Sequence, residues 1–174
     1  MRRVAASAVS IVLTVGAVAG AAAGCGSDQQ AHTVTATDFR FEGIPQSITA
    51  GDRLELRNQS ETEIHELVAF RLAEDETRPI DELVALPPNE LLGLVGREPA
   101  AVLLAAPDGE MVAAVGDGTF DEAGRYGVIC VIPTGADPDE YLAAASESDG
   151  GPPDVAGGPP HIAHGMFAEF TVVD

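Results

Sequence analysis

Short stretches in which apolar and polar residues alternate, separated by glycine and proline, most limit how this chain can fold. The segment from Val34 to Gly43 alternates in this way and is rich in β-branched and aromatic residues. In residues 53–57, Leu54 and Leu56 face one way and charged residues face the other. Residues 65–72 repeat the pattern. A period of two is typical of half-buried β-strands, so the sequence predicts an all-β protein.

Two segments interrupt the strand pattern. Residues 79–98 carry apolar residues at helical spacing on both sides of a Pro-Pro pair, which predicts two short helices. Residues 136–158 contain an Asp-Pro step at Asp137 that caps a helix over about 138–146. We therefore expect one domain, residues 34–174, built as a β-sandwich with two short helical insertions.

The composition argues against two classes of function. The formal net charge is −19, all nine cations are arginine, and only 5% of the residues are aromatic. A strongly acidic surface repels phosphate backbones, so nucleic acid is not expected as a partner. Ser146 and Ser148 lie in a polar segment without the GxSxG context of a hydrolase nucleophile. The protein is not expected to be an enzyme.

The first 25 residues have the order basic, apolar, small that is typical of an export signal. The apolar run ends in "AAGC", residues 22–25, which resembles the lipobox of bacterial lipoproteins. The resemblance implies a signal peptide over residues 1–24, a palmitate-type lipid on Cys25, and a polar tether over residues 25–33 that holds the protein on the outer face of the cell membrane. Cleavage without lipidation and a retained membrane helix are the alternatives.

Lipidation of Cys25 leaves Cys130 alone in an oxidising cell envelope, where it cannot form an intramolecular disulfide. A lone thiol in that setting is either a buried inert side chain or a thiolate with a function. The chain also closes with "HIAHGMFAEFTVVD", residues 161–174, in which two histidines and a methionine directly precede a final predicted strand. Ligand-type side chains at a strand end indicate either a metal site or a loop that happens to contain them.

The order of these residues resembles the cupredoxin family, the blue copper proteins of the plastocyanin and azurin type. His65 follows an Asn-containing loop, "NQSETEIH", and Cys130 closes the strand "GRYGVIC". His161 stands four residues before a Gly-Met pair and the closing strand. The resemblance covers about residues 34–173. It implies a Greek-key β-sandwich and a copper site with the ligands His65, Cys130, His161 and Met166.

Two imidazoles and a thiolate with a weak axial thioether suit copper in both oxidation states. The resemblance therefore implies one-electron transfer between Cu(I) and Cu(II), a redox protein as partner, and a monomer. His164 is the alternative to His161, but the spacing to Met166 and the preceding Pro-Pro pair favour His161. His32 falls in the tether and is expected to be solvated.

One feature departs from compact cupredoxins, which have two residues between the cysteine and the second histidine. Here thirty residues, 131–160, lie between Cys130 and His161. Lengthening a flexible loop that much adds on the order of 2.4 kcal/mol of closure entropy, so the insertion weakens the preorganisation of the site without excluding it. The alternative function is a metal-free cupredoxin-like binding module on the cell surface.

The lipobox makes a testable prediction about processing. Cys25→Ser should abolish labelling of the protein with a radioactive fatty acid and leave an unprocessed or released form, because the thiol is the acceptor of the lipid. Labelling of whole cells followed by fractionation measures both effects. Unchanged labelling and membrane attachment in this variant would rule out lipidation at Cys25.

Overall fold

The computed structural model describes residues 29–95, 99–148 and 152–174. The predicted signal peptide, residues 1–24, and the lipidation candidate Cys25 lie outside these residues. Within the described parts of the chain, no helix is long and apolar enough to cross a membrane.

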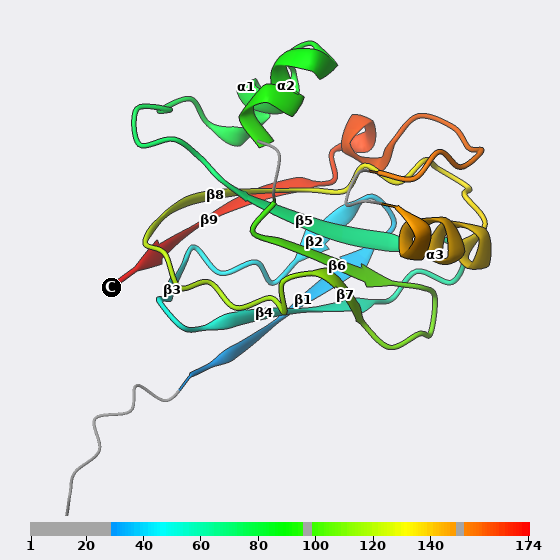
Figure 1. Ribbon diagram of the computed structural model, residues 1–174, viewed down its shortest axis with the longest axis horizontal. Helices are drawn as coiled ribbons and strands as arrows, with labels where there is room; N and C mark the ends of the chain where they lie inside the picture. Colours follow the sequence, from blue (N-terminus) through cyan, green and yellow to red (C-terminus); the bar gives the residue numbers. More distant parts are fainter. Residues whose placement is uncertain (1–28, 96–98, 149–151) are drawn as a thin grey trace, which may run out of the picture.

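Two β-sheets stack face to face, which confirms the predicted β-sandwich (Figure 1). The smaller sheet has the strand order β2-β1-β4, and the larger has the order β3-β9-β8-β5-β6-β7. The pairs β1–β4 and β3–β9 are parallel and the other pairs are antiparallel. The strands of the described residues are β1 (Ala31–Thr37), β2 (Arg40–Glu42), β3 (Ser47–Thr49), β4 (Arg53–Asn58), β5 (His65–Arg71), β6 (Ala101–Ala105), β7 (Val112–Val115), β8 (Gly124–Ile129) and β9 (Phe167–Val173).

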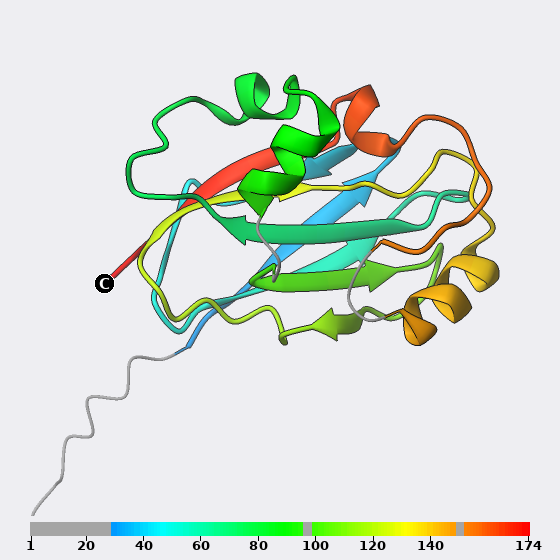
Figure 2. The ribbon, with the colours of Figure 1, turned by 45° about the horizontal axis from the view of Figure 1, so that its top comes forward.

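The central strand β5 is buried on both faces. Leu67 and Ala69 belong to the core between the sheets, whereas Val68 and Phe70 belong to a second apolar cluster on the outer face. This second cluster includes residues of the helices α1 (Ile80–Val84) and α2 (Pro88–Val95), which lie over that face in Figure 2. Because side chains alternate along a strand, His65 shares the inner face with Leu67 and is fully buried.

The helices fall where the sequence predicts them. The helices α1 and α2 occupy the first insertion and are separated at the Pro-Pro pair. In the second insertion, α3 (Pro138–Glu147) begins at Asp137, whose side chain accepts hydrogen bonds from the backbone N–H groups of Asp139 and Glu140. A short 3-10 helix, η1 (His161–His164), precedes β9. Figure 1 shows α3 at the end of the sandwich opposite the C-terminus.

The predicted tether, residues 25–33, is too long. Strand β1 already begins at Ala31 and pairs with β4 from that residue on. His32 is therefore not a solvated tether residue: its Nε2 lies 3.3 Å from Oδ2 of Asp52, and its side chain is only 26% exposed. Pairing of the backbone with β4 extends β1 into residues that do not alternate between polar and apolar. The sequence pattern therefore predicts the start of this strand too late in the chain.

The strand order gathers three chain segments at one end of the large sheet. Strand β8 runs antiparallel to both of its neighbours, β5 and β9. The end of β8 therefore lies beside the starts of β5 and β9. His65 begins β5, Cys130 follows β8 directly, and Met166 directly precedes β9. All three consequently lie at the same pole of the sandwich, together with η1.

The long insertion is closed at its base by backbone contacts. Pro133 and Pro160 form an isolated antiparallel bridge. Beside it, the Thr134 N–H donates to the Pro159 carbonyl over 3.1 Å, and the Gly158 N–H donates to the Thr134 carbonyl over 2.8 Å. The two ends of the insertion thus meet just beyond Cys130 and His161. These contacts close the insertion at its base. They offset the entropy cost of loop closure that the length of the insertion predicts.

The base of the insertion requires glycine at position 157. A Cβ atom there would lie 2.5 Å from Cβ of Pro133 and 3.0 Å from the Thr134 carbonyl oxygen. We expect Gly157→Ala to lower the free energy of unfolding by about 1–3 kcal/mol, the usual cost of overpacking. Urea unfolding measures the loss. Gly158→Ala is the matched control, because its Cβ would make ordinary contacts of 3.4 Å and 3.6 Å with Thr134, and an equal loss in both variants would contradict the prediction.

Candidate metal centre

Three of the four predicted ligands come together in a buried cluster. One ligand atom each from His65, Cys130 and His161 lies within 4.8 Å of the others, and all three residues are fully buried. The three come from the start of β5, the end of β8 and the start of η1. The cluster therefore lies at the pole where the antiparallel strand order joins these segments.

Backbone hydrogen bonds fix the segment of His161 against that of Cys130. The Ile162 N–H donates to the Cys130 carbonyl over 2.8 Å, and the His161 N–H donates to the Ile132 carbonyl over 3.0 Å. The 3-10 helix ends at Gly165, whose φ of 98° favours glycine. The segment of η1 is thus held by backbone hydrogen bonds against the residues that follow β8. In this position the imidazole of His161 points at the thiol of Cys130.

Met166 and His164 differ in their relation to the cluster. Met166 is fully buried, and its carbonyl accepts from the Cys130 N–H over 3.2 Å, so it lies beside the cysteine. The side chain of His164 is exposed, and its ring packs on Phe39 with 4.8 Å between ring centroids. The imidazole that joins the cluster is therefore that of His161, as the spacing favoured, and not that of His164.

The hydrogen bonds of His161 determine its tautomer. Its Nε2 lies 3.2 Å from Oε2 of Glu63, and its Nδ1 lies 3.3 Å from Sγ of Cys130. A carboxylate can only accept, so Nε2 carries the proton and donates it to Glu63. Nδ1 then presents a lone pair toward the thiol, which is the arrangement that a metal ligand needs.

His65 is different because its imidazole is buried without hydrogen bonds. Among the described residues, neither Nδ1 nor Nε2 of His65 has a hydrogen-bond partner. Leaving a buried polar group unsatisfied costs about 1–3 kcal/mol, and most native side chains avoid it. An unsatisfied imidazole that faces a thiol and a second imidazole needs an explanation, and a bound cation supplies one.

Burial keeps the cluster uncharged. Burial, together with the neighbouring His161, lowers the pKa of His65 to about 4, although the carboxylates of Glu63 and Asp38 oppose this shift. Burial also lowers the pKa of His161, although the hydrogen-bonded Glu63 opposes this shift. The pKa of the Cys130 thiol is raised by burial and then by the nearby carboxylate of Glu66. At neutral pH the cluster therefore holds two neutral imidazoles and a protonated thiol.

The sequence did not reveal three residues that surround the cluster. Glu63 bonds His161, Phe39 packs edge-on against the same imidazole at 5.1 Å between centroids, and the Glu66 N–H donates to Cys130 Sγ over 3.5 Å. Phe39 lies in the turn between β1 and β2 with φ at 63°, an uncommon conformation for an aromatic residue. Glu66 follows His65 directly, so a polar residue inside a buried strand was the available signal.

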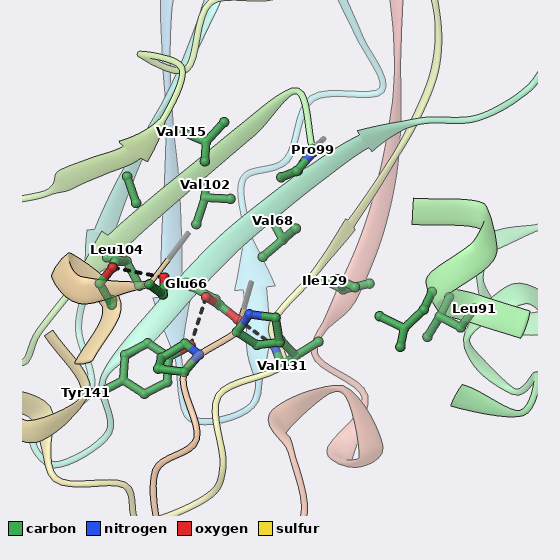
Figure 3. Close-up of a pocket in the computed structure, with 16 residues that line it drawn as sticks. Glu66, Val68, Leu91, Pro99, Val102, Leu104, Val115, Ile129, Val131 and Tyr141 are labelled. Carbon is green, nitrogen blue, oxygen red and sulfur yellow. Dashed lines mark hydrogen bonds between the residues drawn. The ribbon is translucent and has the colours of Figure 1, made fainter. Parts of the chain in front are cut away.

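Glu66 lies between the cluster, where its backbone N–H donates to Cys130 Sγ, and a pocket on the outer face of the large sheet, which its carboxylate lines (Figure 3). It accepts hydrogen bonds from the Val131 N–H at 3.0 Å and from the Tyr141 hydroxyl at 3.2 Å, and burial raises its pKa to about 7. The pocket has a volume of about 280 Å³ and lies between α2 and α3. Most of its lining is apolar, including Val68 and Val102.

Comparison with known proteins returned likenesses of structure. No protein-family profile matches the chain, and no curated protein sequence matches it significantly. Sodium-dithionite-reduced auracyanin from the photosynthetic bacterium Roseiflexus castenholzii aligns with 86% of this chain and 100% of its own, with a TM-score of 0.45 and 18% identity. Auracyanin B aligns with 83% of this chain and 89% of its own, with a TM-score of 0.40 and 17% identity. The fold and the site stand on the strand order and the His–Cys–His cluster described above.

Proposed function

We propose that the protein is an exported one-electron carrier with copper held by His65, Cys130 and His161, and with Met166 as a weak axial donor. The observation that carries this proposal is the buried imidazole of His65. Its two nitrogens find no hydrogen-bond partner in the described parts of the chain, although a thiol and a second imidazole lie within 4.8 Å. A site built only for packing would gain by replacing these groups with apolar ones.

The donor set fits copper better than magnesium or calcium. Magnesium and calcium prefer oxygen ligands, whereas two imidazoles and a thiolate suit a copper ion in either oxidation state. Copper bound there would supply a one-electron couple, Cu(II)/Cu(I). The protein contributes a buried cluster whose donors are fixed by backbone hydrogen bonds at the ends of three segments. Rigid donors favour fast electron transfer because little has to rearrange.

The location and partner belong to the same proposal. The export signal and the lipobox-like "AAGC" support attachment to the outer face of the cell membrane through a lipid on Cys25. The net charge of −19 favours a redox partner with a basic docking surface, because opposite potentials steer two proteins into contact.

A metal-free binding module is the second candidate. The apolar pocket beside Glu66 supports it, since its volume of about 280 Å³ lies close to the lower end of the roughly 300–1,000 Å³ that is typical of small-molecule sites with few polar groups. A metal titration separates the two functions. The electron carrier binds copper with an intense visible absorption, whereas the binding module takes up no copper at all.

Substitution of the ligands gives the first test. Cys130→Ser should remove the visible charge-transfer band of the copper-loaded protein, because the thiolate is its source. His161→Ala should lower copper affinity strongly, while His164→Ala should leave it nearly unchanged because that side chain is exposed and outside the cluster. Absorption spectra and chelator competition measure these effects. Equal colour and affinity in the wild type and His161→Ala would refute this ligand set.

The second test counts protons. At pH 7 the pKa of His65, about 4, and the lowered pKa of His161 leave both imidazoles neutral, while the raised pKa of Cys130 keeps its thiol protonated. At pH 8, above the pKa of about 7 that burial gives Glu66, copper binding should therefore release about one proton, and the affinity should rise about tenfold per pH unit between roughly pH 8 and 9. Calorimetry in buffers of different ionisation enthalpy measures this number. Release of two or three protons would show that the imidazoles are charged in the metal-free protein.

A further inference from the structure

We infer that Glu63 is a positioning residue for the metal centre: it sets the tautomer of His161, fastens the long insertion to the loop before β5, and stabilises the oxidised ion over the reduced one. This inference rests on the proposed copper site. It assigns a role to a residue of the loop before His65 that is not itself a ligand.

The geometry places one carboxylate oxygen at the junction of two segments. Oε2 of Glu63 lies 3.2 Å from Nε2 of His161 and accepts from the Gly135 N–H over 2.9 Å. His161 follows the insertion, and Gly135 lies near its beginning. A single side chain in the loop before β5 therefore holds both ends of the insertion.

The loop that carries Glu63 is itself rigid. The Asn58 side-chain amide donates to the carbonyls of Glu63 and Ala105 over 2.8 Å and 2.9 Å. The Glu63 N–H donates to Oγ of Ser60 over 3.0 Å, and Ser60 bonds Asp38 over 2.7 Å. Hydrogen bonds therefore hold the backbone of Glu63, and with it the carboxylate, in place. A residue that orients a metal ligand needs such a fixed backbone.

The buried environment strengthens the influence of this charge. His161 is fully buried, and the side chain of Glu63 is only 13% exposed. A negative charge hydrogen-bonded to a ligand makes the imidazole a better donor, and it favours the more highly charged ion. Glu63 should therefore increase affinity for Cu(II) more than for Cu(I), which lowers the reduction potential of the site.

Two substitutions at Glu63 separate its charge from its hydrogen bonds. Glu63→Gln keeps an acceptor oxygen and removes the charge, whereas Glu63→Ala removes both. Glu61→Gln is the matched control, because it makes the same charge change two residues away on an exposed side chain. The measurements are Cu(II) and Cu(I) affinities by chelator competition, the reduction potential, and ¹⁵N chemical shifts of the histidine rings in the metal-free protein.

We expect Glu63→Gln to keep the visible band and the Nε2–H tautomer but to lower Cu(II) affinity more than Cu(I) affinity, so that the potential rises. Glu63→Ala should lose the tautomer preference and lower Cu(II) affinity by about 10- to 100-fold, as removal of outer-shell partners does. An equal change of potential in Glu63→Gln and Glu61→Gln would overturn the role of the charge. An unchanged ¹⁵N spectrum in Glu63→Ala would overturn the positioning role.

The ring-nitrogen measurement does not depend on copper. If the wild-type protein binds no copper but Glu63→Ala changes the tautomer of His161, the proposed function fails while the positioning of His161 by Glu63 stands. If the wild type binds copper and neither Glu63 variant differs from Glu61→Gln, the function stands and this inference fails.

Discussion

The main-chain groups of Cys130 hold the rest of the site in register. Its N–H donates to the Met166 carbonyl over 3.2 Å, and its carbonyl accepts from the Ile162 N–H over 2.8 Å. Both partners belong to the short segment between the insertion and β9. The residue that carries the thiol is thus also the backbone anchor of the segment that carries the second imidazole. If this pairing were lost, Cys130 and His161 would no longer face each other.

The site could be predicted from the sequence to the extent that its residues are marked by strand ends. His65 and Cys130 stand at the ends of predicted strands, and His161 lies in the short segment before the last strand. The resemblance to cupredoxins selected these three residues, and the structure brings them together. The residues around the cluster are not set apart by any pattern in the sequence. Glu63 is one of several acidic residues in a polar loop, and only the folded chain shows that it faces His161 rather than solvent.

The thirty-residue insertion shows a different limit of sequence reasoning. Its length alone predicts that His161 is held loosely relative to Cys130. The backbone bridge between Pro133 and Pro160 removes most of that effect, because the chain returns to its starting point before the histidine. No sequence pattern around Pro133 or Pro160 predicts this contact. A pairing between distant backbone segments depends on the whole fold, and it has no local pattern to reveal it.

The electrostatic setting of the cluster combines neutral donors with nearby carboxylates. The imidazoles are neutral and the thiol is protonated because burial disfavours charge, whereas Glu63 and Glu66 approach the cluster from His161 and from Cys130. A cavity with neutral donors is tolerable without a metal, and acidic neighbours favour a cation when one arrives. The same arrangement is therefore compatible both with folding of the metal-free chain and with the proposed metal site.

The strand order at this pole also determines at what stage of folding the His–Cys–His cluster can form. His65 begins β5, whereas His161 lies ninety-six residues later, just before the last described strand, β9. The two meet only after β9 has been made and has paired with β8. A chain that is still being synthesised or threaded through a membrane cannot offer the complete set of donors. A metal held by these donors would accordingly be bound only after the whole domain has folded.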